Sequence, residues 1–449
     1  MNYNMLKKIL LGAVNLLLIF KSGEVVGQQT RNLSLSEAIK MSVDNSKQLK
    51  LSKAKVDEAV ANYHDMWNNH LPDVKASGAY LRVNNPNINL KVNLTGASSS
   101  DTTKSASSSV KVNQAAYGMV SASLPLFSGF RIKYGVESAK YLEQAAKLDV
   151  ENDKEAVVLN TVDAFSNLYK AKNSVDLVKQ NLEQETQRVT DFSNMVDNGL
   201  MARNDLLKAQ LQQSNVELTL LDAQNNYRMA CVNMDLMLGL PENTELVPDT
   251  SLFDNKADAG SVINWEQTAL QNRKDMSALN FREQAATSAI KSTKGEYYPS
   301  VALTGGYVAL DIPNLLNIPN AFNGGIGLQY NFGALWKTGA KIDQAKARLH
   351  ELQANEDMLT DQIRIQINQA YENYLLSQKK IAVYAVAVDQ ADENYRITKN
   401  KYDNSLVTTT DLLEADVAQL QAKLNFSFAK VDEVVAYKKL QEAAGTISK

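Results

Sequence analysis

Two long stretches of the chain combine good helix-forming residues with regularly spaced apolar positions. Residues 136–198 and 340–444 contain neither glycine nor proline. In the first stretch, apolar residues recur at alternating intervals of three and four, with Glu185 as the only polar break, at Leu168, Ala171, Val175, Val178, Leu182, Val189, Phe192 and Val196. Leu413, Val417, Leu420, Leu424, Val431 and Val434 repeat this spacing in the second, with Ser427 in the gap. Such a seam is typical of coiled coils. A helix of some 65 residues from Arg131 would be roughly 100 Å long.

Shorter segments with alternating apolar residues lie next to these stretches and predict β-strands. Ile326, Leu328, Tyr330 and Phe332 alternate with small or polar residues, and Ala122, Leu124 and Leu126 do the same. Residues 74–83 and 301–310 alternate less clearly, and we expect them to form the partner strands. Each segment has about ten residues, the length of a tilted membrane strand. Aromatic residues typical of a membrane interface accompany them, namely Tyr80, Tyr117, Phe127, Tyr307, Tyr330 and Phe332, with Trp67 and Trp336 at the expected helix–strand junctions.

The chain contains an internal repeat. Residues 197–209 align with residues 403–415 at an offset of 206, and seven of the thirteen pairs are identical, where average composition gives about one. Earlier in the unit, Pro72, Val74, Gly78 and Tyr80 match Pro299, Val301, Gly305 and Tyr307 at an offset of 227. The first copy has a longer loop rich in serine, residues 96–109, where the second has only residues 311–321. Each copy therefore predicts helix, strand, loop, strand, very long helix, tight turn and returning helix.

The N-terminus has the features of an export signal. Lys7 and Lys8 precede an apolar run over residues 9–20, and small residues up to Gly27 suit cleavage before Gln28. A membrane anchor is the alternative, although twelve apolar residues are fewer than the roughly 20 that span a bilayer. We expect a signal peptide at 1–27, a first repeat at 28–240, a linker at 241–261 and a second repeat at 262–449.

The remaining segments predict no transmembrane helix, which leaves a β-barrel or a secreted protein. Four strands cannot close a barrel, and open strand edges are not tolerated in lipid. Several chains would have to pool their strands, and three chains would supply twelve. The pattern alone leaves two, three or four copies open.

With these features the sequence resembles the outer-membrane efflux protein family, whose namesake is TolC. The resemblance runs from about Leu33 to Gly445, and its most specific parts are the two turn-plus-helix motifs at 198–207 and 405–413 and the segment 126–129 at the strand-to-helix junction. It implies an α+β membrane protein. Three chains, each with four strands, would form a twelve-stranded barrel in the outer membrane of a Gram-negative bacterium, with a long α-helical coiled-coil tunnel in the periplasm. The implied function is passive conduction of substrates from an inner-membrane pump and a periplasmic adaptor, with outer-membrane lipid as a further partner.

Candidate site residues gather at the two turns. Asp411 and Glu414 would form rings of carboxylates at the tunnel constriction, which favour cations. The same pair fits a local capping box in which Asp411 caps the helix and Glu414 returns the bond. The resemblance also suggests a bond from Tyr402 to Asp205 and a basic latch partner at Lys430. Asp205 is itself a good N-cap.

The adaptor would dock at the turns, at Gly199, Leu200, Ser405 and Leu406, which otherwise have plain turn chemistry. Two positions depart from the family's pattern. The second turn has Ser405 where glycine is frequent, so Asn404 is the expected left-handed residue. Val407 stands where TolC-like members can have an arginine of the tip latch.

Catalytic and metal-binding patterns are absent from the sequence. His64, His70 and His350 are scattered, there is no phosphate loop or nucleophile elbow, and Cys231 is the only cysteine. A net charge of −3 gives no reason to expect nucleic-acid binding. We therefore expect neither an enzyme nor a cofactor. Two alternatives stay open, the outer component of a type I protein-secretion system and a secreted coiled-coil scaffold without a barrel.

Overall fold

The computed structural model describes residues 30–84, 112–249, 260–313 and 315–447. The predicted signal peptide, the serine-rich loop at 96–109 and part of the linker at 241–261 therefore lie outside the described residues. The chain divides into two compact units. Unit 1 consists of residues 1–50, 153–273 and 363–449, and unit 2 of residues 51–152 and 274–362.

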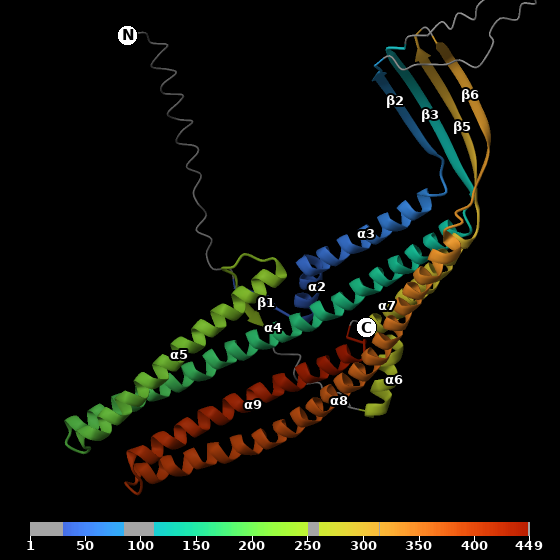
Figure 1. Ribbon diagram of the computed structural model, residues 1–449. Helices are drawn as coiled ribbons and strands as arrows, with labels where there is room; N and C mark the ends of the chain where they lie inside the picture. The colour runs from blue at the N-terminus through green and yellow to red at the C-terminus, as the bar shows by residue number, and fades with distance from the viewer. Residues whose placement is uncertain (1–29, 85–111, 250–259, 314, 448–449) are drawn as a thin grey trace, which may run out of the picture. The chain divides into compact units, whose positions relative to one another are not determined.

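Unit 2 contains one four-stranded antiparallel sheet (Figure 1). Its strands are β2 (Asp73–Arg82), β3 (Gln114–Phe127), β5 (Ser300–Ile312) and β6 (Leu316–Gln329), in the order β2-β3-β5-β6. Gly78 lies opposite Gly118, and Tyr117 opposite Leu310. The four predicted strands are confirmed. Because β6 begins at Leu316, the predicted loop at 311–321 is in fact a tight hairpin.

The sheet carries large apolar side chains on its surface. Val74, Leu303, Phe322, Ile326 and Leu328 are all exposed. Contiguous exposed apolar surface is unusual for a protein in water and marks contact with another chain or with lipid.

The predicted long helices are present. They are α4 (Arg131–Asp197) and α8 (Ala334–Asp403), with 67 and 70 residues, and each is followed by a returning helix, α5 (Arg203–Leu238) or α9 (Thr409–Ala443). Shorter elements precede them, namely α2 (Leu35–Asn45), α3 (Lys47–Asn68), α6 (Val262–Asn272), α7 (Lys274–Lys294) and a 3₁₀ turn at Gly295–Tyr297. Trp67 lies in the last turn of α3 and Trp336 in the first turn of α8, as predicted for the helix–strand junctions. Among the described helices, none combines the length and apolarity needed to cross a bilayer.

The junction between β3 and α4 depends on two left-handed residues in succession. Gly129 has a φ of +64°, and Phe130 follows with a φ of 62°. A Cβ at position 129 would lie only 2.2 Å from the carbonyl oxygen of Gly295. Only glycine fits there, because both the backbone conformation and the close approach exclude a side chain.

In unit 1 the four long segments lie side by side in the order α8, α9, α4, α5 (Figure 1). Gln419 on α9 donates to Asp392 on α8 at 2.8 Å, and Lys170 on α4 pairs with Asp432 on α9. Gln213 on α5 donates to Thr186 on α4 at 3.1 Å. Each helix is therefore tied to the next by polar contacts.

The largest core of unit 1 lies between α2, α4 and α5. Phe165 and Leu168 of α4 pack with Met234 and Leu238 of α5 and with the residues around Leu35. Cys231 is buried in this core. The parallel pair of β1 (Thr30–Leu33) and β4 (Glu245–Pro248) covers one side through Leu33 and Leu246. This core holds the two antiparallel helices at the end away from their turn.

Candidate gate and docking site

The turns that end the two helical hairpins have the same backbone geometry. In the first, Gly199 N–H donates to Val196 at 2.9 Å and Leu200 N–H to Met195 at 2.8 Å. In the second, Ser405 and Leu406 donate to Tyr402 and Lys401, both at 2.9 Å. These paired bonds are a Schellman motif, which needs a left-handed residue. Gly199 has a φ of +71°, and in the second turn the residue is Ser405, with a φ of 61°. The expectation that Asn404 would be left-handed is therefore wrong.

One leucine projects from each turn. Leu200 is 79% exposed and Leu406 is 73% exposed. A single exposed leucine is common, but here both lie at equivalent places of two matching turns. A single apolar cluster joins the two hairpins next to their turns, with Phe192 from α4, Ala209 from α5 and Leu412 from α9.

The start of α9 has a capping box, but not the predicted one. Thr408 is the N-cap, and its hydroxyl accepts from the Asp411 N–H at 3.3 Å. The Asp411 carboxylate accepts in return from the Thr408 N–H at 2.8 Å. Asp411 is thus the third residue of the helix, and the prediction that Asp411 caps while Glu414 returns the bond is wrong. The bonds from Thr408 lower the pKa of Asp411.

Asp411 and Glu414 both remain exposed on α9, one turn apart. Because Asp411 uses one oxygen for the capping box, its charge is fixed in position and faces solvent. The structure therefore brings these two carboxylates together near the turn, where the charge of a helix N-terminus also favours anionic groups.

The three weaker latch candidates have other partners within the chain. The Tyr402 hydroxyl lies 3.4 Å from that of Thr409, and its ring stacks on Phe192. Asp205 pairs with Lys208 at 3.5 Å, and the expectation that it is an N-cap is wrong, because Ala202 has that position in α5. Lys430 lies over the ring of Phe426, with 4.6 Å between its Nζ and the ring centroid. The chain by itself thus forms neither the Tyr402–Asp205 bond nor an ion pair at Lys430 among its described contacts.

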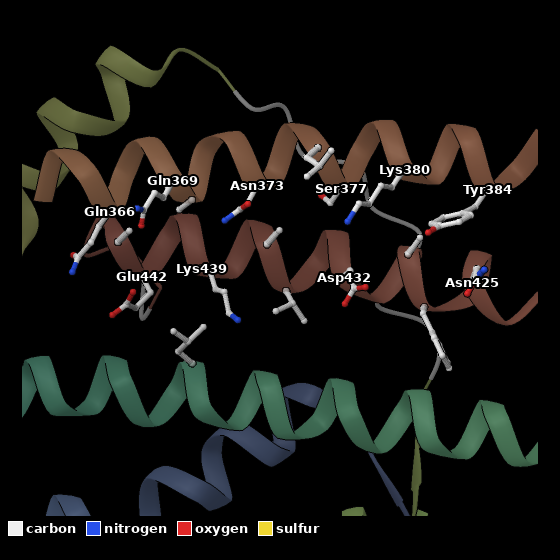
Figure 2. Close-up of a pocket in the computed structure, with 18 of the residues that line it drawn as sticks. Gln366, Gln369, Asn373, Ser377, Lys380, Tyr384, Asn425, Asp432, Lys439 and Glu442 are labelled. Carbon is white, nitrogen blue, oxygen red and sulfur yellow. The ribbon is translucent and has the colours of Figure 1, made fainter. Parts of the chain in front are cut away.

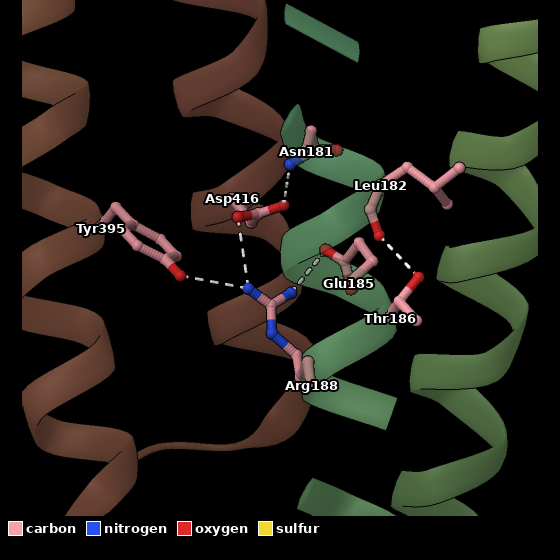
Figure 3. A network of polar contacts seen from close by, with 7 residues as sticks. All are labelled: Asn181, Leu182, Glu185, Thr186, Arg188, Tyr395 and Asp416. Carbon is pink, nitrogen blue, oxygen red and sulfur yellow. Dashed lines mark hydrogen bonds and ion pairs between the residues drawn. The ribbon is translucent and has the colours of Figure 1, made fainter. Parts of the chain in front are cut away.

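A buried polar cluster lies around Arg188 of α4 and Asp416 of α9 (Figure 3). Arg188 on α4 donates from Nη1 to Glu185 Oε1 at 2.5 Å and from Nη2 to Asp416 Oδ1 on α9 at 3.3 Å. The same Nη2 donates to the Tyr395 hydroxyl on α8 at 3.2 Å, and Asn181 donates to Asp416 Oδ2 at 2.8 Å. This polar cluster joins three of the four helices.

Burial changes the acidity of the polar cluster. It raises the pKa of Glu185 to about 8, helped by the neighbouring Asp416 carboxyl and opposed by Arg188. Burial alone would lower the pKa of Arg188, but the two carboxylates outweigh it and raise the pKa.

Comparison with known proteins identifies the family. The model of the outer membrane efflux protein family matches residues 38–240 and 265–446. The chain belongs to the outer membrane efflux protein family. It is therefore an outer-membrane channel component of an efflux system, with its helical part in the periplasm. The family consists of transport channels rather than enzymes.

Three related proteins are similar in sequence to this efflux protein. It is 23% identical over 333 residues to the outer membrane efflux protein BepC of Brucella suis, which covers 72% of this chain and 70% of BepC. It is 22% identical over 306 residues to TolC of Vibrio cholerae, and the match covers 66% of this chain and 69% of TolC. It is 20% identical over 306 residues to the alkaline protease secretion protein AprF of Pseudomonas aeruginosa, and the match covers 66% of this chain and 63% of AprF.

Solved structures share the fold. The Campylobacter jejuni CmeC outer membrane channel has a TM-score of 0.77 at 17% identity, covering 92% of the efflux protein and 86% of CmeC. CusC has a TM-score of 0.75 at 18% identity, covering 92% of both chains.

The efflux protein also has a polar groove of about 750 Å³ along α8 and α9 (Figure 2). Its labelled lining is mostly amide, hydroxyl and charged, with Gln366, Gln369, Asn373, Ser377, Lys380, Tyr384, Asn425, Asp432, Lys439 and Glu442. Lys439 also pairs with Asp163 on α4 at 3.3 Å. Within the described residues, no cluster of His, Cys, Asp and Glu could hold a metal ion.

The sequence did not identify Arg188, Asp416, Asn181 or Tyr395 as site residues. A signal was present, because Glu185 interrupts an otherwise apolar seam and Arg188 follows three residues later, on the same face of the helix. Asp416 could not be found this way, because only the packing of α9 on α4 brings it to the pair.

Proposed function

We propose that three copies of this outer-membrane efflux protein close a single channel, with a twelve-stranded barrel in the membrane and a periplasmic tunnel of twelve helical segments. The observation that carries this proposal is that both outermost helices of unit 1 have an unpartnered apolar stripe. Family membership supports the same assembly.

The stripe on α5 lies opposite its intrachain neighbour. The side of α5 that packs on α4 contains Ala209, Val216 and Ala223, which are buried. At 100° per residue, the opposite side contains a set of exposed apolar residues, namely Leu207, Leu218, Leu221, Met229 and Leu236. Since α5 is the last helix in the row, this stripe has no partner within the described part of unit 1.

The other end of the row has a matching stripe on α8. Its buried side includes Ile363, Ile367 and Tyr374. The opposite side has exposed Ile365, Leu376, Val383, Val386 and Ile397. Because the two stripes lie on different helices, contact between copies is head to tail, and such contacts form a ring when the rotation between copies closes. Burying both stripes stabilises the assembly, because removing apolar surface from water contributes about 25 cal/mol of free energy per Å².

The sheet needs the same arrangement. β2 and β6 are edge strands, and open edges are costly in lipid. Pairing the β6 edge of one copy with the β2 edge of the next satisfies the backbone of both strands. Three copies of four strands give a barrel of workable size.

The internal repeat predicts the register between copies. The two halves have the same order of elements, α3-β2-β3-α4-α5 and α7-β5-β6-α8-α9. We infer that α8 of one copy packs on α5 of the next as α4 packs on α9 within a chain. Within the chain, Asn173 on α4 contacts Ser427 on α9. The repeat offset of 206 relates Asn173 to Lys379 on α8 and Ser427 to Leu221 on α5. We therefore expect Lys379 of one copy to lie next to Leu221 of the next copy.

A cysteine pair tests the trimer and its register together. Leu221→Cys with Lys379→Cys should form disulfides between copies on mild oxidation, giving a covalent trimer on denaturing gels. The matched control, Leu221→Cys with Ala387→Cys, moves one cysteine by about 12 Å along α8 and should not cross-link. Monomers only, or equal cross-linking of both pairs, would contradict the proposed assembly.

We propose that Asp411 and Glu414 form the constriction at the tip. Three copies would gather six carboxylates around one axis, and a ring of carboxylates sets the potential that passing ions feel. Asp411→Asn with Glu414→Gln should abolish cation preference in planar bilayers. Thr408→Ala is the control, because it removes the capping hydroxyl and keeps both charges. Unchanged selectivity in the double variant would remove the gate assignment.

We propose that the two turns, with Gly199, Leu200, Ser405 and Leu406, dock a periplasmic adaptor that links the channel to an inner-membrane pump. The exposed Leu200 and Leu406 support this. So does a groove of about 670 Å³ between α5 and α9, with Leu211 and Val417 in its wall. Photo-cross-linking residues at positions 200 and 406 should capture the adaptor in cells. The same probe at the exposed Glu351 should not capture it, and equal capture at all three positions would contradict tip docking.

A second candidate is the outer component of a type I protein-secretion system. The resemblance to AprF, named for alkaline protease secretion, favours it. The pump captured together with the adaptor would distinguish the two. A secreted scaffold without a barrel would be recovered without detergent.

A further inference from the structure

The polar cluster brings three formal charges into a place that solvent hardly reaches. Glu185 and Asp416 have no exposed surface, and Arg188 is 8% exposed. One guanidinium cannot neutralise two carboxylates. If both acids were ionised, one net negative charge would be buried without compensation, which is costly in a medium of low polarity.

The hydrogen bonds of the cluster indicate which oxygen atom binds a proton. Both oxygens of Asp416 accept bonds, one from Arg188 and one from Asn181. Glu185 Oε1 accepts from Arg188, but the buried Oε2 has no hydrogen-bond partner. An ionised carboxylate can only accept, whereas a protonated one can also donate. A proton on Oε2, directed at Asp416, would satisfy this oxygen and leave the cluster with no net charge.

Among the described residues, Arg188 and Asp416 are the charged groups that act on Glu185. On its own helix the charged neighbour is Arg188, on α9 it is Asp416, and α8 contributes the Tyr395 hydroxyl through Arg188. From α5, Gln213 reaches only Thr186, the next residue of α4. Protonation of Glu185 is therefore set by its burial and by two side chains, Asp416 and Arg188.

We propose that Glu185 is held as a neutral acid whose proton bridges it to Asp416, and that this proton clamps α9 and α8 on α4 just above the tip. Loss of the proton places two carboxylates against each other and weakens the clamp. The expected direction follows from linkage. Burial raises the pKa of Glu185 to about 8 in the folded protein, so the clamp is intact well below that pH and loosens as the pH rises through it.

The clamp is present at the α4–α9 contact within each chain but not at the proposed α8–α5 contact between copies. With the offset of 206 used above for the trimer, Glu185 and Arg188 correspond to Ala391 and Asn394 on α8, and Asp416 corresponds to Gln210 on α5. None of these counterparts titrates. The seam within each chain would therefore respond to pH, while the seam between chains would not.

Infrared difference spectra of the full-length protein in detergent test the protonation. Between about pH 7 and about pH 9.5, the wild type should lose the band of one carboxylic acid, with a midpoint near 8. Glu185→Gln should abolish this change. Asp235→Asn, which alters another buried carboxyl, should leave it in place. A band that persists unchanged in Glu185→Gln would overturn the assignment.

Hydrogen exchange tests the clamp itself. Amides near the start of α9 and around residue 188 should lose protection in the wild type as the pH rises through 8, relative to Glu185→Gln at the same pH. Asp416→Asn removes the neighbouring charge and should lower the infrared midpoint by about one pH unit or more. Equal loss of protection in Glu185→Gln, or an unmoved midpoint in Asp416→Asn, would contradict the proposal. These readouts need no ion conduction, so they stand or fall separately from the cysteine test of the trimer.

Discussion

Three carboxylates in the described part of unit 1 have no exposed surface, and their surroundings differ. Asp416 accepts hydrogen bonds on both oxygens, and Glu185 pairs with Arg188 on one. Asp235, near the end of α5, makes no hydrogen bond of normal geometry on either oxygen. Burial raises its pKa to about 6, although the backbone N–H of Thr244 partly opposes this. Asp235 is thus the least compensated of the three.

Replacing Asp235 with asparagine should stabilise the protein. At neutral pH the buried carboxylate is ionised, and an unsatisfied buried polar group costs on the order of 1–3 kcal/mol. Because the pKa of Asp235 is raised, this penalty is present above about pH 6 and fades as the pH falls below it. Thermal unfolding of Asp235→Asn should therefore show a gain at pH 7.5 that shrinks at pH 5. Asp222→Asn, an exposed change on the same helix, should show none; a gain independent of pH would contradict this explanation.

At the scale of single residues, local patterns predict which residue types lie at the tip but not their roles. Two overlapping capping patterns begin at Thr408 and at Asp411, and both are locally sound. The first is used because Leu412 is buried against Phe192, which fixes where the helix begins. Similarly, the turn's hydrogen bonds require the left-handed residue at Ser405 and not at Asn404. Both choices depend on packing between helices, which a local pattern does not contain.

At the scale of elements, the start of α9 offers a direct test of capping. Thr408→Ala removes the hydroxyl that accepts the Asp411 N–H, and loss of such a cap costs about 1 kcal/mol. Spread over a long packed helix, this should lower the unfolding temperature only slightly. Thr408→Ser, which keeps the hydroxyl, should behave like the wild type. A large loss of stability in Thr408→Ala alone would mean that Thr408 has a further role at the tip.

The β3–α4 junction should be far less tolerant. Gly129→Ala combines a left-handed conformation, worth roughly 1–2 kcal/mol, with a Cβ only 2.2 Å from a backbone oxygen. Gly199→Ala shares the left-handed conformation, but nothing lies within 4 Å of its Cβ. We expect Gly129→Ala to fail to accumulate in the membrane and Gly199→Ala to accumulate with a modest loss of thermal stability. Similar yields of the two variants would mean that the junction can relax.

The elements themselves were well predicted, because their signals are long and periodic. Long stretches without glycine and proline predict α4 and α8, and alternating apolar and polar residues predict the four strands. The end of β6 was not predicted correctly, because Tyr330 and Phe332 continue the alternation beyond Gln329. There the side chain of Asn331 accepts the Gly333 N–H at 3.0 Å and turns the chain. This competition between a side chain and the strand ladder is invisible to a hydrophobic pattern.

At the scale of the whole molecule, the exposed stripes and strand edges imply that the isolated chain is incomplete. We expect the mature protein to be extracted only with detergent and to migrate as a trimer until it is heated. The reason is that apolar sheet residues such as Phe322 and Ile326 require a nonaqueous neighbour. A double variant with Leu218→Lys and Val383→Lys, which places charges in both helical stripes, should lower the temperature at which the trimer dissociates. Recovery of a folded, detergent-free monomer would contradict this prediction.

The buried position of Cys231 has a practical consequence. Burial raises the pKa of its thiol, and the thiolate is the reactive form. The native chain is therefore nearly inert toward thiol reagents, and a spin label or fluorophore attached to an introduced cysteine should report from that position alone. Distances between labels at Leu200 of different copies could then follow the diameter of the tip in a lipid bilayer, without first removing the native cysteine.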